Sequence, residues 1–191
     1  MQRTVSNTFK PVSYESIDHF YTHFDVEKPS SAIQIEDNLP IQMRWVNRNS
    51  ETTLVIFSAA ITRRAATEVP IFSGWNTTKH LSVNLLMISD PSLILHSDLN
   101  LAWYVGSQHQ PLLMDSITRI MKVFAKTTRL IFFGASGGGY AALSQACRLP
   151  GSTAVVSNPQ TDIRRFSYYP EFMRLAWPGH EDPHYVVSSS A

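Results

Sequence analysis

The chain contains a single cysteine, Cys147, among its 191 residues. One cysteine excludes a disulfide framework within the chain and any metal site built from several cysteines. The first 30 residues mix charges, histidines and aromatics and have no apolar stretch behind basic residues, so they do not resemble a secretory signal. Together these absences predict a reducing compartment, and we expect a cytoplasmic protein.

An excess of either charge is also missing. Sixteen Lys and Arg residues stand against fifteen Asp and Glu residues, which gives a formal net charge of +1. Proteins that bind phosphate backbones usually carry a basic excess or a basic stripe, so we expect no nucleic-acid partner. Asp18, His19 and His23 resemble part of a metal site, but no further ligands accompany them. We therefore expect neither a metal nor a cofactor.

Long apolar runs are absent as well. The most apolar stretch, residues 81–105, is interrupted by Asn84, Asp90 and Pro91, so it cannot cross a bilayer as one helix. Hydrophobic residues still make up 43% of the chain, which is enough for a buried core, and the length suits one domain. We predict a lead-in segment over residues 1–38 that packs on a domain over residues 39–191.

Within that domain, short apolar runs alternate with helical patterns. Runs rich in β-branched residues are typical of strands buried on both faces, and steps of three and four are typical of amphipathic helices. The predicted strands are 41–46, 53–57, 85–88, 101–105, 129–133, 153–157 and 185–187; the predicted helices are 111–126, 140–149 and 163–177, the last with a break at Pro170. This alternation predicts an α/β fold with a mostly parallel sheet and helices on both faces.

Glycine is scarce, with eight residues in the chain, and four of these lie at positions 134–139. The segment Gly134-Ala135-Ser136-Gly137-Gly138 satisfies G-x-S-x-G between a predicted strand and a predicted helix. A serine on such a sharp turn adopts an unfavourable backbone conformation, and bulky side chains two residues before and after it would collide. The pattern therefore predicts that Ser136 is raised above the sheet at a helix N-terminus.

That location suits a nucleophile. The helix dipole and the free N–H groups of the first turn favour developing negative charge, and the Gly137 N–H would donate to an oxyanion. A second donor is expected from the loop after strand 53–57, where Ala59 and Ala60 would let the backbone approach a substrate carbonyl. Two alternatives remain open: a tight turn with an unreactive serine, and a phosphate-binding glycine loop, although the segment lacks the lysine of a Walker A motif.

With this motif the sequence resembles the α/β-hydrolase superfamily over about residues 53–162, the serine turn being the specific element. The resemblance implies a serine hydrolase of the esterase or acyl-transfer type, which acts through an acyl-enzyme on Ser136. Residues 134–162 are also similar to bacterial hydrolase-like proteins found near surface-glycan genes. A small-molecule or glycan-linked acyl substrate is the partner that this implies.

The resemblance also implies a chain order of serine, acid and histidine. Asp162 follows strand 153–157 and is the leading candidate for the acid, with capping of the next helix as its alternative role. His180 is the first choice for the general base, and His184 and His109 are the others.

The superfamily core normally continues for two more strands, so the chain resembles a truncated or degenerate member whose sheet is incomplete at the C-terminal side. The alternative function is therefore a catalytically silent domain with a binding role.

Overall fold

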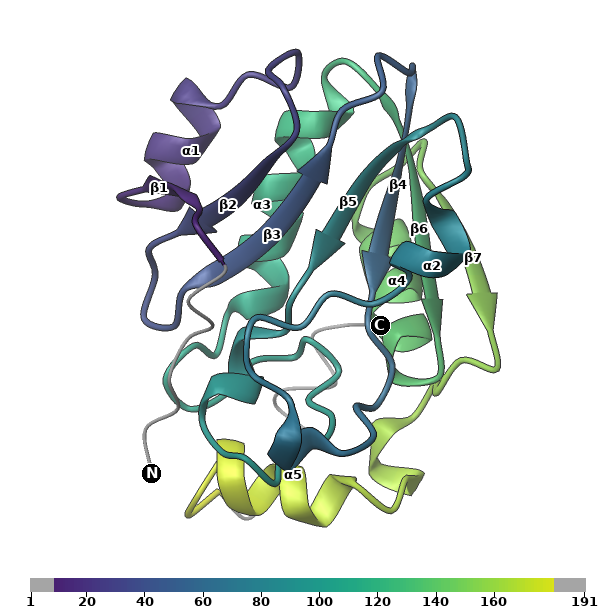
Figure 1. Ribbon diagram of the computed structural model, residues 1–191. Helices are drawn as coiled ribbons and strands as arrows, with labels where there is room; N and C mark the ends of the chain where they lie inside the picture. The colour runs from purple at the N-terminus through teal and green to yellow at the C-terminus, as the bar shows by residue number, and fades with distance from the viewer. Residues whose placement is uncertain (1–8, 181–191) are drawn as a thin grey trace.

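The computed structural model describes residues 9–180, which form one seven-stranded sheet in the order β1-β2-β3-β5-β4-β6-β7 (Figure 1). Only β3 runs against the others, because it pairs antiparallel with β2 and β5 while every other neighbouring pair is parallel. The strands are β1 (Val12–Tyr14), β2 (Ser31–Ile35), β3 (Ile41–Val46), β4 (Thr52–Phe57), β5 (Asn84–Ile88), β6 (Arg129–Ala135) and β7 (Thr153–Ser157).

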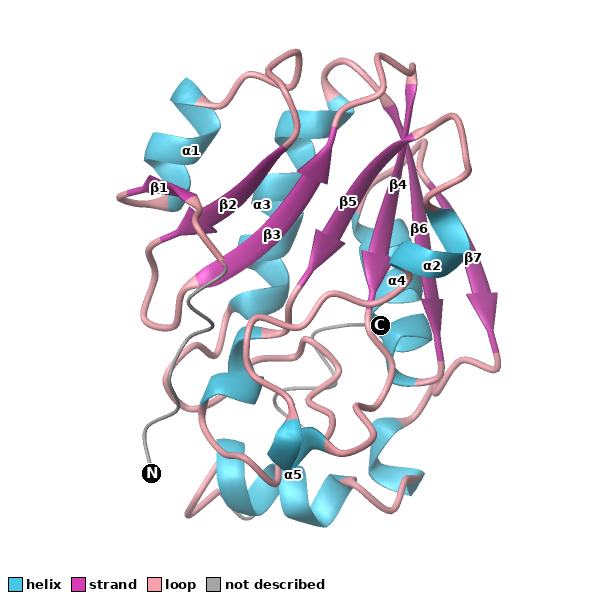
Figure 2. Cartoon of the chain, in the orientation of Figure 1, coloured by secondary structure: helices cyan, strands magenta, loops and turns pink. Residues whose placement is uncertain are grey.

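Helices cover the two faces of this sheet unequally. Figure 2 shows α3 and α4 behind the sheet and the short α2 in front of it. The α-helices are α1 (Ile17–His23), α2 (Trp75–Thr78), α3 (Leu113–Ala125), α4 (Gly137–Arg148) and α5 (Tyr169–Ala176); the 3-10 helices are η1 (Arg64–Ala66), η2 (Pro91–Ile94) and η3 (Ile163–Arg165). The predicted α/β class with a mostly parallel sheet and helices on both faces is confirmed.

The two faces bury separate sets of side chains. Val55 and Phe57 of β4 belong to the large core that α3 and α4 cover, whereas Leu54 and Ile56 belong to a smaller cluster on the other face. This alternation explains the continuous apolar run of β4, since both of its faces are covered. α1 joins the large core through Phe20, which contacts Phe124 of α3 with 6.3 Å between ring centroids.

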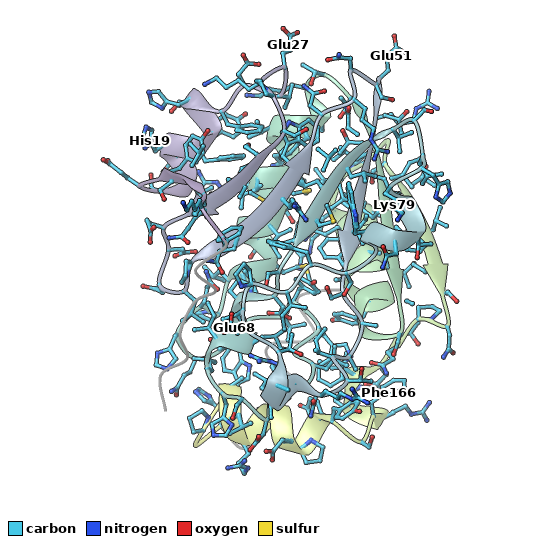
Figure 3. All side chains as sticks on the ribbon, in the orientation of Figure 1. His19, Glu27, Glu51, Glu68, Lys79 and Phe166 are labelled. Atoms are coloured by element: carbon cyan, nitrogen blue, oxygen red, sulfur yellow. The ribbon has the colours of Figure 1, made fainter. Side chains whose placement is uncertain are left out.

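The carboxyl ends of β4, β5, β6 and β7 meet at one end of the molecule. In Figure 1 their arrowheads point towards the end that α5 occupies. Figure 3 marks the two ends with labelled side chains, Phe166 at this end and Glu27 and Glu51 at the other. Ligands of open α/β sheets bind outside the carboxyl ends of the strands, so this is the end at which a site is expected.

One expectation about elements was wrong. Residues 101–105 form a buried irregular segment in place of a strand, because Trp103 and Tyr104 adopt left-handed backbone conformations with φ of 52° and 61°. The lead-in segment contains β1, α1 and β2, which were not among the predicted elements; β2 forms through its antiparallel pairing with β3. The division at residue 38 stays a prediction.

The expected strand at 185–187 lies outside the described residues. None of the helices in residues 9–180 combines the length and the apolarity that crossing a membrane requires.

Candidate active site

Ser136 occupies the turn between β6 and α4. Its backbone has φ of 52° and ψ of −119°, a region that residues with a side chain rarely adopt. Holding a residue there costs about 1–3 kcal/mol, and such strain persists where the surrounding structure dictates it. The side chain is half-buried, and its hydroxyl has no hydrogen-bond partner among the described residues.

The neighbouring glycines leave no room for side chains. A Cβ atom on Gly134 would lie 2.2 Å from the carbonyl oxygen of Gly138, and one on Gly138 would lie 2.5 Å from that of Phe57. On Gly137 the same atom would lie 2.5 Å from the Leu101 side chain. The first turn of α4 therefore packs directly against the end of β4, as the sharp serine turn requires.

Backbone hydrogen bonds fix the turn from the far side. The Ser136 N–H donates to the carbonyl of Ser157 at 3.0 Å, and the Ser136 carbonyl accepts from the N–H of Gln160 at 3.1 Å. The N–H groups of Gly139 and Tyr140 donate to the same carbonyl at 3.0 and 3.3 Å. The backbone on both sides of the hydroxyl is therefore held while the hydroxyl itself is left unbonded.

Free N–H groups lie on both segments that meet at this turn. The N–H of Gly137 begins α4, and those of Ala59 and Ala60 follow β4 in a half-buried loop. Within residues 9–180 none of these three N–H groups has a hydrogen-bond partner. The close approach of Gly138 to Phe57 and Ser58 places the first turn of α4 against the residues that lead into the loop with Ala59 and Ala60.

Solved structures with a TM-score above 0.5 share this architecture. The capsule O-acetyltransferase of Neisseria meningitidis serogroup A has a TM-score of 0.55 at 16% identity, over 80% of this chain and 63% of its own. The glycosylation-associated Gap123 complex of Streptococcus agalactiae has a TM-score of 0.54 at 16% identity, over 83% of this chain and 32% of its own. What they share with this chain is an α/β fold with a mostly parallel sheet and helices on both faces.

A homologue of hormone-sensitive lipase from a metagenome library is also similar, with a TM-score of 0.49 at 14% identity, over 91% of this chain and 65% of its own. No protein-family model and no curated protein matches the sequence. The chain spans less than two thirds of the length of each of these solved structures.

Asp162, the candidate acid, caps η3. Its carboxylate accepts a hydrogen bond from the Arg164 N–H at 3.2 Å and pairs with the Arg164 guanidinium at 2.8 Å. Hydrogen bonding to this guanidinium holds the pKa of the Asp162 carboxyl below its usual value of 3.8. The structure thus contains the capping role that the sequence offered as the alternative, and the role of catalytic acid stays a prediction.

Neither His109 nor His180, the candidate bases among residues 9–180, makes a hydrogen bond with Ser136. His180 is exposed and packs edge-on against Trp177, with 5.4 Å between ring centroids, while exposed His109 contacts its neighbour Gln108. His184 lies outside the described residues. In the described part of the chain, no three His, Cys, Asp or Glu side chains gather as metal ligands do.

Sequence reasoning missed a buried polar group beside this site. Asp90 follows β5 and accepts hydrogen bonds from the N–H groups of Ser92 at 3.0 Å and Tyr104 at 2.7 Å. Burial raises the pKa of the Asp90 carboxyl to about 6, and burial with the Asp90 charge raises the pKa of the Tyr104 phenol. The Asp-Pro pair that opens η2 was a signal of the cap, but it gave no indication of the Tyr104 contact.

Proposed function

We propose that this chain carries out serine-dependent acyl transfer, as an esterase or an O-acyltransferase. The observation that carries the proposal is the strained turn of Ser136, with φ of 52°, a free hydroxyl and the unpaired Gly137 N–H directly after it. Strain of this kind at a helix N-terminus is typical of a nucleophile elbow.

In the proposed reaction the Ser136 Oγ attacks the carbonyl carbon of an ester while a general base takes the hydroxyl proton. Gly137 and the Ala59-Ala60 loop donate hydrogen bonds to the oxyanion. The ester C–O bond then breaks, the alcohol leaves with the proton, and the acyl group stays on Ser136. Water or a second alcohol then attacks the acyl carbon and gives its proton to the base. The bond between this carbon and the Ser136 Oγ breaks, the base returns the proton to Oγ, and the acid or the new ester leaves.

The similarity to a capsule O-acetyltransferase and to a glycosylation-associated complex supports a glycan-linked acyl substrate, with a sugar hydroxyl as the acyl acceptor. Asp162 is the proposed acid and His180 the proposed base, with His184 and His109 as the other candidates. No metal or cofactor enters these steps.

A fluorophosphonate probe, which bonds covalently to activated serines, tests the proposal. The folded wild-type chain is expected to be labelled, and Ser136→Ala is expected to lose the label. Ser152→Ala is the matched control, because Ser152 is also half-buried but its hydroxyl donates to the Leu149 carbonyl outside the site. Equal labelling of Ser136→Ala and wild type would contradict the proposal.

The same probe separates the candidate acid and bases. Asp162→Asn and His180→Gln are each expected to slow labelling by about a hundredfold or more, because general base catalysis contributes roughly that factor. His184→Gln and His109→Gln serve as comparisons, and the slowest histidine variant identifies the base.

The silent alternative is favoured by one observation: within residues 9–180, no histidine has a recorded contact with Ser136. A well-folded wild-type chain that takes no label would establish this alternative.

A further inference from the structure

Trp103 and Tyr104 are two consecutive bulky residues with positive φ, and both are fully buried, at 0% and 1% exposure. Left-handed backbone is unfavourable for such residues, and it persists only where the surroundings impose it. Nothing in the proposed reaction uses these side chains, so the strain needs another explanation. The hydrogen-bond partners of the two side chains all lie at or after the carboxyl ends of strands, at the end of the sheet that carries Ser136.

The Tyr104 phenol joins the ends of two strands. Its oxygen accepts a hydrogen bond from the Ser58 N–H at 2.8 Å and donates one to the Ile88 carbonyl at 2.9 Å. Ser58 is the first residue after β4, and Ala59 and Ala60 follow it directly. The phenol therefore fixes the point at which the chain leaves the sheet, and with it the direction of the next two N–H groups.

The left-handed conformation of Tyr104 is itself held by Asp90. The carboxylate accepts the Tyr104 N–H at 2.7 Å and is almost fully buried, since Asp90 is 3% exposed. The Phe57 ring packs edge-on against Tyr104 with 4.9 Å between centroids. Backbone, phenol and ring are thus each restrained by a different neighbour.

Trp103 reaches the serine turn from the other side. Its indole N–H donates to the Gln160 side-chain oxygen at 2.5 Å, and the Gln160 N–H donates to the Ser136 carbonyl at 3.1 Å. Leu101, two residues earlier, fills the space that keeps position 137 free of a side chain. The same short segment therefore contacts both the turn that carries Ser136 and the loop that carries Ala59 and Ala60.

We propose that residues 101–104 position the two halves of the oxyanion site against each other, with Tyr104 setting the 58–60 loop and Trp103 setting the Ser136 turn. This inference rests on the proposed function for its chemical meaning. Tyr104 is a positioning residue, because its hydroxyl is buried, donates a hydrogen bond to the Ile88 carbonyl and accepts one from the Ser58 N–H. It holds the oxyanion donors and does not touch substrate.

Tyr104→Phe tests this, because it removes the hydroxyl and keeps the ring. Thr53→Val is the matched control: Thr53 is fully buried, and its hydroxyl contacts that of Thr128 at 2.9 Å at the opposite end of β4. Hydrogen exchange of the Ser58 amide, which donates to the phenol, is expected to accelerate at least tenfold in Tyr104→Phe and to stay unchanged in Thr53→Val. The rate of fluorophosphonate labelling is expected to fall at least tenfold in Tyr104→Phe alone.

Trp103→Phe is the second variant, which keeps an aromatic ring against Phe172 and removes the donor to Gln160. It is expected to speed exchange at the Ser136 and Gln160 amides and to leave the Ser58 amide less affected. Equal exchange of the Ser58 amide in Tyr104→Phe and Thr53→Val would overturn the inference. Exchange does not require catalysis, so a wild-type chain that takes no label refutes the proposed function while exchange still decides the positioning role.

Discussion

Gly138 illustrates how strictly the serine turn selects its residues. A methyl group at this position would lie 2.5 Å from the Phe57 carbonyl oxygen and 2.9 Å from that of Ser58, both of them backbone atoms that a rotamer change cannot move. The sequence motif predicted small residues at 134 and 138 because of their spacing around Ser136. It could not predict that Gly137 must also be small, since its neighbour Leu101 is distant in the chain.

We therefore expect Gly138→Ala to lower the free energy of unfolding by about 1–3 kcal/mol, the usual cost of overpacking, and to abolish labelling of Ser136. Gly151→Ala is the control, because position 151 also disfavours alanine, with φ of +86°, but has no atom within 4 Å of a new Cβ. It precedes β7 and so lies at the opposite end of the strands from Ser136. Urea denaturation and probe labelling measure the two effects. Full labelling of Gly138→Ala would show that the close packing is dispensable.

Individual elements were predictable where burial and local pattern agreed. β4 and β6 were expected from their apolar runs, and α3 from its apolar stripe. β7 was also expected from its apolar run, although it is a partly exposed edge strand. Residues 101–105 have an equally apolar run but form no strand, because their polar backbone groups are satisfied from outside, as the Asp90 carboxylate does for Tyr104. A hydrophobic run indicates burial, and the partner that satisfies the backbone decides the conformation.

Asp90, the cap of η2, makes stability depend on pH. Its folded-state pKa of about 6 exceeds its ordinary value of 3.8. At a pH between these two values, the Asp90 carboxyl is protonated in the folded chain and ionised in the unfolded chain. Stability therefore falls as pH rises through this range, by roughly 3 kcal/mol at about 1.4 kcal/mol per tenfold change in proton affinity.

In Asp90→Asn this contribution is absent, because the amide does not titrate. Urea midpoints of the wild type and Asp90→Asn, measured from pH 4 to pH 7.5, are expected to diverge, with the wild type losing more stability as pH rises. Asp162 and Glu171, whose pKa values are lowered by Arg164 and Arg174, oppose this trend equally in both proteins. Parallel midpoint curves would refute the assignment to Asp90.

In the molecule as a whole, segments that are distant in the sequence meet at one end of the sheet. Residues 57–60, 88–90, 101–104, 134–139 and 157–160 all contribute contacts there. The serine turn and the small-residue loop after β4 could be predicted, because each follows a recognisable strand. The segment that joins them could not, because its partners are distant in sequence and only the folded chain brings them together.

This arrangement leads to a kinetic prediction. Pairing of β4 with β6 closes the long stretch from Phe57 to Arg129, and contacts that are distant in sequence form slowly. On dilution from urea, far-UV circular dichroism is expected to recover before fluorophosphonate labelling, because helices form locally and the serine turn requires several strand ends. Recovery of both signals with one rate constant would contradict this order.

The same convergence affects how a bound molecule would act on the protein. A ligand between the 58–60 loop and the first turn of α4 would bridge segments that separate when the chain unfolds, and it would bind the unfolded chain poorly. Its binding energy would therefore add to the stability of the entire sheet, and the melting temperature would rise with ligand concentration. A thermal-shift survey of acylated sugars can thus search for the natural substrate without any measurement of turnover.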